Sequence, residues 1–233
     1  VDRSCILDPL TQPLPFTPFK DFTGRSINEI NLYSTEMSSA LCSIDRVSAS
    51  ANMNNRLSEA IVEAYKSTNG APISFELMLK CYQSRMKDAN NDDSISSVLK
   101  QLVNAHIFES EDKVSLIDDS YIIKMDGYPK DGPIAKAIVY FLMSKLNNIY
   151  ELLDKQAVND EVVQIRHFSI IDEAHYMLDF DNRPLRNLIA VGRNKGLSII
   201  LATQNMSSFK SKGFDFYANA QYPLIMKQQT IDD

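Results

Sequence analysis

Two adjacent carboxylates, Asp172 and Glu173, come directly after a mostly apolar stretch, residues 168–171. A continuous apolar run is typical of a strand buried on both faces, as in a parallel sheet between helices. The carboxylates would then lie at the C-terminal end of that strand, where open α/β sheets bind their ligands. One carboxylate can hold Mg²⁺, directly or through water, because hard cations select oxygen ligands. The other can orient and deprotonate a water, and nucleotide hydrolysis needs this division of labour.

An ordinary strand that ends in a solvated acidic turn would show the same pattern, so the motif needs support from the rest of the chain. A helix-like segment, residues 183–196, follows the carboxylates, and a second apolar segment, residues 197–202, leads into Thr203 and Gln204. Two buried strands joined by a helix make a right-handed βαβ unit. Because the two strand ends would lie side by side, we expect Gln204 to reach a γ-phosphate or the water that Glu173 contacts.

The segments FSIIDEAH and GRNKGLSIILATQ belong to a stretch from Phe168 to Gln204 that resembles the second half of a HerA/FtsK-type P-loop ATPase. They are similar to the Walker B strand, the helix with a Gly-Arg pair and the glutamine sensor of that family. Its members are hexameric DNA-translocating motors related to the VirB4-type secretion ATPases. The order of elements resembles the family more loosely over most of the chain. Within the family, the resemblance points to the HerA-like ATPase of phosphorothioation-dependent restriction systems.

The resemblance implies a role for each polar residue at the two strand ends. Asp172 would bind the nucleotide through Mg²⁺, and Glu173 would be the catalytic general base. Gln204 would be the catalytic sensor of the γ-phosphate, with Thr203 supporting it in nucleotide binding. The cofactors implied are therefore ATP and Mg²⁺.

Arg193 is the best candidate for an arginine finger that one subunit offers to the site of its neighbour. Charge on a transferring phosphoryl group needs a fixed cation, and such an arginine can be worth about 10³–10⁵ in rate. The alternative is that Arg193 or Arg186 only flanks the C-terminal end of a helix, where positive charge is favourable. His175 either couples the site to the next strand or hydrogen-bonds locally, and the sequence leaves both roles open.

Charge and cysteine content limit the partners and the compartment. The net charge is −6, which by itself does not indicate nucleic acid. Residues 183–233, however, hold seven Lys or Arg and three Asp, a balance of +4 that could touch phosphates of nucleotide or DNA. The three cysteines lie far apart without a CxxC pair, which argues against disulfides and zinc and favours the reducing cytoplasm. No apolar run reaches the roughly 18 residues of a membrane span.

The predicted fold is α/β, a RecA-like P-loop NTPase core with a mainly parallel sheet, without its P-loop strand here, plus a helical insertion. Residues 1–46 would begin the core, residues 47–118 would form the insertion, and residues 119–233 would complete the core with the Walker B and sensor strands. Hydrophobic periodicity, caps and turn residues give the individual elements. Helices are expected from Ser26 to about 44 and at 54–66, 74–85, 92–107 and 134–155, and further strands at 4–7, 113–117, 121–126 and 222–227.

A P-loop needs the pattern GxxxxGK[ST], and none of the seven glycines forms it. We expect the P-loop upstream in a longer protein, since a domain that had abandoned hydrolysis would have no chemical reason to keep Glu173. The function expected is an ATP-hydrolysing motor of a DNA-processing or phage-defence restriction system. It would act as a homo-hexamer on double-stranded DNA, with a nuclease or restriction enzyme as a possible partner. The alternatives are a superfamily 2 DEAH-type helicase core and a non-hydrolysing assembly scaffold with the same fold.

Overall fold

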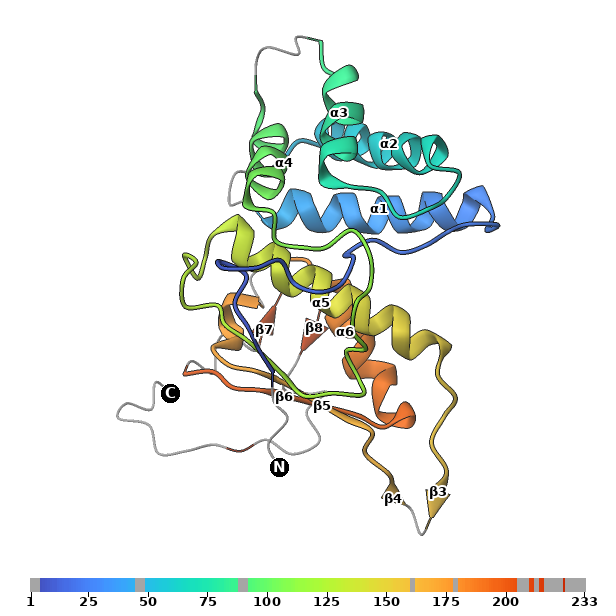
Figure 1. Cartoon of the computed structure of the whole chain (residues 1–233), viewed down its shortest axis with the longest axis vertical. Coiled ribbons are helices and arrows are strands. Elements are labelled where there is room, and N and C mark those ends of the chain that lie inside the picture. Colours follow the sequence, from blue (N-terminus) through green and yellow to red (C-terminus); the bar gives the residue numbers. More distant parts are fainter. Residues whose placement is uncertain are drawn as a thin grey trace.

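A computed structural model describes residues 5–44, 49–87, 92–159, 162–177, 180–204, 210–211, 214–215 and 224. None of the helices in these ranges is long and apolar enough to cross a membrane. Figure 1 shows the arrangement of the elements along the chain. The helices are α1 (Ile27–Ile44), α2 (Ala51–Ser67), α3 (Phe75–Ser84), α4 (Ser94–Ala105), α5 (Pro133–Leu152) and α6 (Arg183–Val191), with 3₁₀ helices η1 (Ala174–Met177) and η2 (Gly192–Lys195). The strands are β1 (Cys5–Leu7), β2 (Tyr121–Ile123), β3 (Val158–Asn159), β4 (Val162–Val163), β5 (His167–Ile171), β6 (Leu197–Leu201), β7 (Lys210–Ser211) and β8 (Phe214–Asp215).

Parallel strand pairing is the feature that positions the candidate site. β5 and β6 pair in parallel, in a register that runs from His167 opposite Leu197 to Ile171 opposite Leu201. α6 and η2 connect these strands, so the predicted βαβ unit is confirmed. β1 and β2 form a second parallel pair, while the short pairs β3–β4 and β7–β8 are antiparallel. The chain is therefore an α/β protein with small parallel sheets.

Helix α5 lies between helices α1–α4 on one side and the strands with α6 on the other (Figure 1). Pro133 occupies its first turn, where a missing backbone N–H costs nothing, and Gly132 precedes it as the N-cap. Ile138, Phe141 and Leu146 are buried along the helix and belong to one core cluster that also includes residues of α1–α4, α6 and β6. Because α5 contributes to the packing on both sides, it joins the helical part of the chain to the strand pairs.

The helices predicted between Ser26 and residue 107 are confirmed to within a few residues at their ends. α1 begins with the expected capping box: the Ser26 N–H donates to the Glu29 carboxylate at 3.0 Å, and the Glu29 N–H faces the Ser26 hydroxyl at 3.4 Å. The side chains of Ser50, Ser74 and Asp93 cap the N-termini of α2, α3 and α4. Since these helices share a core cluster with α5, the division of the chain at residues 46 and 118 stays a prediction.

The strand predicted at residues 113–117 is wrong, because these residues form bends and turns instead. Their neighbour is the proline-rich stretch 13–18, and the Lys113 N–H donates to the Pro15 carbonyl at 2.9 Å. Prolines 13, 15 and 18 lack the N–H groups that a continuous ladder needs, so only an isolated bridge, Leu14 to Phe108, forms nearby. The strand predicted at 222–227 lies outside the described residues, apart from Leu224.

The expectation that the central strand is buried on both faces is also wrong for the described residues. In β5, Ile171 is 9% exposed, whereas Phe168 and Ile170 are 56% and 68% exposed. Ile200, opposite Ile170 in β6, is 45% exposed. Successive side chains of a strand point to opposite faces, so one face of the β5–β6 pair packs into the core and the other is an open apolar face. No described helix covers that second face.

The same substitution at two neighbouring positions of β5 distinguishes its buried face from its exposed face. Ile171→Ala should lower the free energy of unfolding by about 2–5 kcal/mol, the usual cost of deleting buried methyl groups. Ile170→Ala should change it by no more than about 0.5 kcal/mol, as at other surface positions. Urea denaturation of both variants measures the difference. Equal losses would contradict the open face and would mean that Ile170 is covered in solution.

Candidate active site

The C-terminal ends of β5 and β6 bring the predicted site residues together. The Ala202 N–H donates to the Ile171 carbonyl at 2.9 Å, and the Ala174 N–H donates to the Ala202 carbonyl at 2.7 Å. The ladder therefore continues past both strands and holds the segments that follow them side by side. The carboxylates that follow β5 thus lie next to the polar residues that follow β6, as the sequence predicted.

A direct hydrogen bond joins Glu173 and Gln204. The Gln204 Nε2 amide donates to Glu173 Oε1 at 2.8 Å. Glu173 has a φ of +51°, in the left-handed region that residues other than glycine rarely adopt, at a cost of roughly 1–3 kcal/mol. The Glu173 N–H donates to Asp172 Oδ1 at 2.9 Å, a local bond that supports this conformation. The backbone after β5 is thus held in a strained turn that presents the Glu173 side chain to the end of β6.

His175 and Thr203 complete the cluster. His175 Nδ1 lies 3.3 Å from Glu173 Oε2 and 3.3 Å from Thr203 Oγ1. The side chains of Glu173 and His175 are 27% and 25% exposed, so the cluster is partly shielded yet reachable from solvent. The sequence left the role of His175 open, and its position two residues after Glu173 was the signal for including it.

Asp172 is exposed, and the Glu173 N–H already occupies its Oδ1. Within the described ranges there is no group of three or more His, Cys, Asp or Glu side chains that could hold a metal ion. Mg²⁺ commonly uses only one or two carboxylates and takes its other ligands from water and phosphate oxygens. The residues present therefore fit a Mg²⁺ that arrives with a nucleotide and that Asp172 holds directly or through water.

Arg193 is not part of this cluster in its own chain. It lies in η2, which precedes β6, so the five-residue strand separates it from Gln204 by roughly 16 Å along the strand direction. Its side chain is exposed, and no ion pair or hydrogen bond joins it to another described residue. Arg186, the other arginine considered, is ion-paired with Asp181 at the start of α6. Of the two, Arg193 is the one whose guanidinium is available to another molecule.

The glycines and the lysine around Arg193 have structural roles. The Lys195 ammonium donates to the carbonyls of Tyr150 and Glu151 at 2.6 and 3.0 Å, where α5 ends and its last carbonyls need partners. Gly196 has a φ of +82°, and a Cβ there would lie 2.7 Å from the Gln164 carbonyl oxygen. The GRNKG segment therefore fixes the start of β6 against α5 and the segment that precedes β5.

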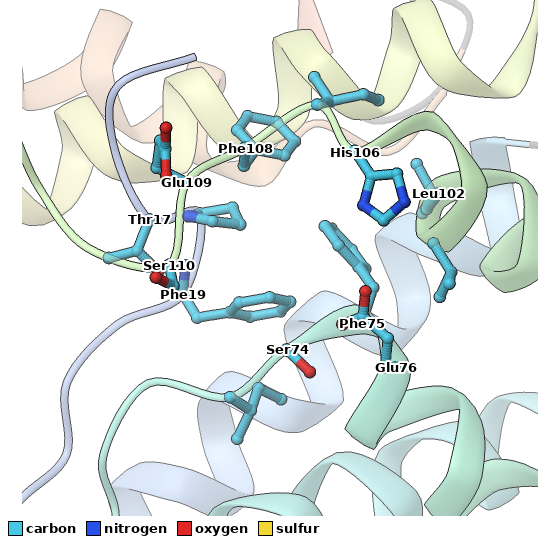
Figure 2. A pocket seen from close by; sticks show the side chains of 14 residues that line it. Thr17, Phe19, Ser74, Phe75, Glu76, Leu102, His106, Phe108, Glu109 and Ser110 are labelled. Atoms are coloured by element: carbon cyan, nitrogen blue, oxygen red, sulfur yellow. Dashed lines mark hydrogen bonds between the residues drawn. The ribbon is translucent and has the colours of Figure 1, made fainter. Parts of the chain in front are cut away.

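A pocket of about 180 Å³ lies away from the strand ends, and none of the predicted site residues lines it. Figure 2 shows Phe19, Phe75 and Phe108 around it, with His106 near Leu102 at the end of α4. His106 has a left-handed backbone as the C-cap of α4. The predicted site residues that the structure brings together thus lie at the strand ends and not in this pocket.

The sequence matches no protein-family profile and no curated protein, but the fold matches solved structures. VirB4 of Thermoanaerobacter pseudethanolicus superposes with a TM-score of 0.57 and 16% identity, over 93% of this chain and 60% of that one. The bacterial conjugative coupling protein TrwB, in complex with sulphate, gives a TM-score of 0.51 and 14% identity over 90% of this chain and 54% of that one. The plasmid coupling protein TrwB, in complex with the non-hydrolysable ATP analogue ADPNP, gives 0.54 and 13% over the same shares.

These similarities define the fold of the chain. It shares the α/β architecture of VirB4 and of TrwB. The chain spans between about half and three fifths of the length of these proteins. At these identities the agreement concerns the fold alone, and the roles of individual side chains have to be tested on this chain.

A Cβ at Gly196 would meet backbone atoms, so a substitution there tests how tightly the segment is held, and Gly24 serves as the control. Gly24 also has a positive φ, +72°, but nothing lies within 4 Å of a Cβ placed there. Gly24→Ala should therefore cost only the left-handed penalty of roughly 1–2 kcal/mol. Gly196→Ala should cost about 1–3 kcal/mol more, because its Cβ meets backbone atoms. Urea denaturation compares the two, and similar losses would mean that the Gly192–Gly196 segment is less tightly held than described.

Proposed function

We propose that this chain belongs to an ATP-hydrolysing motor of the HerA/FtsK type, in which Asp172, Glu173, Thr203 and Gln204 act on the triphosphate. The hydrogen bond between Gln204 Nε2 and Glu173 Oε1, at the ends of two paired parallel strands, is the observation that carries the proposal. Hydrolysis needs one group to activate the water and another to sense the γ-phosphate within reach of it. The fold similarity to VirB4, and to TrwB in complex with an ATP analogue, supports the same reading.

In the proposed mechanism each residue has one task. Mg²⁺, when bound, neutralises charge on the phosphates, and Asp172 holds it directly or through water. Gln204 moves from Glu173 to the γ-phosphate as nucleotide enters, and the Oε1 atom that it leaves accepts the proton of the attacking water. Thr203 supports Gln204 from the neighbouring position. The proposal requires a P-loop from outside these 233 residues, since the GxxxxGK[ST] pattern does not occur among them.

The finer parts of the proposal concern assembly and substrate. The position of Arg193, exposed and at the opposite end of β6 from Gln204, supports an arginine finger offered to a neighbouring subunit in a ring, which we take to be a hexamer. The basic balance of residues 183–233 supports double-stranded DNA as the substrate. A cytoplasmic restriction system with a nuclease partner follows from the sequence resemblance. A DEAH-type helicase and a non-hydrolysing scaffold remain the competing functions.

Replacing the proposed base tests the activity directly. In the full-length protein, Glu173→Gln should lower kcat for Mg²⁺-dependent ATP hydrolysis by about 10²–10⁴-fold, because the amide cannot accept the proton of water. ATP binding should persist, since the change leaves the Mg²⁺ ligand in place. Glu76→Gln, an exposed position on α3, is the matched control and should hydrolyse ATP normally. Undiminished hydrolysis by Glu173→Gln would rule out the assignment, and the absence of ATP binding in the wild-type protein would favour the scaffold.

Mixing two inactive variants tests the arginine finger. Arg193→Ala and Glu173→Gln subunits should each form rings that hydrolyse ATP slowly. After mixed reassembly, activity should return in part, because some interfaces then pair an intact Glu173 with an intact Arg193 from the neighbour. The control mixes Glu173→Gln subunits with subunits that carry both changes, and no such interface can form there. A lack of recovery in the first mixture would place Arg193 outside the neighbouring site, and a monomeric active protein would favour the helicase.

A further inference from the structure

His175 contacts residues from both strand ends of the candidate site. Its Nδ1 atom faces both Glu173 Oε2 and Thr203 Oγ1 at 3.3 Å, so one ring nitrogen bridges the residues that follow β5 and those that follow β6. Gln204 Nε2 occupies the other oxygen of the Glu173 carboxylate. Each oxygen of the Glu173 carboxylate therefore has a neighbour in this structure, His175 from the segment after β5 and Gln204 from the segment after β6.

The imidazole itself is anchored by the backbone and by an aromatic neighbour. η1 begins directly after Glu173, and Ala174 is fully buried with its N–H bonded to the Ala202 carbonyl at 2.7 Å. The Tyr176 ring lies against the His175 ring, with centroids 4.1 Å apart and an interplanar angle of 37°. The Lys130 ammonium lies over the Tyr176 ring, 5.7 Å from its centroid. The His175 ring therefore has contacts besides the one with the carboxylate.

We propose that His175 is a positioning residue for Glu173, and this inference rests on the proposed function. With its proton on Nδ1, the imidazole presents the positive end of its N–H dipole 3.3 Å from Glu173 Oε2, an electrostatic contact that restrains the carboxylate from rotating about its last side-chain bond. The same nitrogen lies against Thr203, so a shift of the end of β6 when Gln204 engages a phosphate is transmitted to the carboxylate. A fixed carboxylate keeps its accepting oxygen aligned with the attacking water, which raises kcat without changing the affinity for ATP.

Three substitutions distinguish positioning through Nδ1 from a local structural role. His175→Ala removes the Nδ1 contact, and in the full-length protein kcat for ATP should fall by about 10–100-fold, the range found when side chains that orient metal ligands are removed. KM should stay close to the wild-type value, because the contact does not involve the nucleotide. His175→Asn keeps a donor near the place of Nδ1 and should restore most of kcat. His175→Gln puts its donor near the place of Nε2 and should behave like the alanine variant.

His167, the first residue of β5, offers a matched control. It stands at the opposite end of β5, it is half-buried, and burial lowers its pKa, so it is neutral at pH 7. His167→Asn should leave both kcat and KM unchanged. Thermal unfolding of each variant shows whether it folds, and should the alanine variant fail to fold, the asparagine and glutamine variants decide alone.

The outcomes separate this inference from the proposed function. Wild-type kcat in His175→Ala, or rescue by glutamine but not by asparagine, would overturn the positioning role while Glu173→Gln still abolishes hydrolysis. A higher KM with unchanged kcat would also overturn it, because His175 would then contribute to binding. If the Glu173→Gln protein hydrolyses ATP normally, it is the proposed function that fails, whatever the histidine variants do.

Discussion

The register in which β5 pairs with β6 determines where every candidate catalytic side chain lies. The five paired positions, from His167 with Leu197 to Ile171 with Leu201, bring residues 172–175 level with residues 202–204. A shift of one residue would move Gln204 by about 3.3 Å and turn its side chain to the other face. The 2.8 Å contact to Glu173 would then be impossible. Every statement about the site therefore depends on this short parallel pairing.

Two anchors at the opposite end of the strands maintain the register. The positive φ of Gly196 lets its carbonyl accept the N–H groups of Arg166 and His167, at 2.7 and 3.1 Å, just before β5 begins. Lys195 ties the same segment to the end of α5. Because Arg193 belongs to this anchored end, its guanidinium is held away from the Glu173 of its own chain. A single βαβ unit thus presents a carboxylate at one end and an arginine at the other.

Sequence patterns were sufficient for the helices and for the order of the βαβ unit, because caps and periodicity are local signals. They failed for residues 113–117, where the lack of donors in the facing proline-rich stretch prevented a ladder. They also failed to predict that one face of β5 is exposed. The run Phe168–Ser169–Ile170–Ile171 is compatible with a strand buried on one face or on both, because the burial of each face depends on which other segments pack against it. In the described structure α5 and α6 lie on one side only, which leaves Phe168 and Ile170 exposed.

The sequence by itself determined which residue types stand at the two strand ends and that these ends would meet, because parallel strands joined by a helix place their C-terminal ends at the same edge. It also showed that Arg193 comes before the second strand. Only the tertiary structure decided that Glu173 adopts a left-handed backbone, that Gln204 reaches its Oε1, and that His175 bridges Glu173 and Thr203. Such contacts depend on side-chain directions and on distances of a few ångströms between segments about thirty residues apart, and no spacing along the chain encodes them.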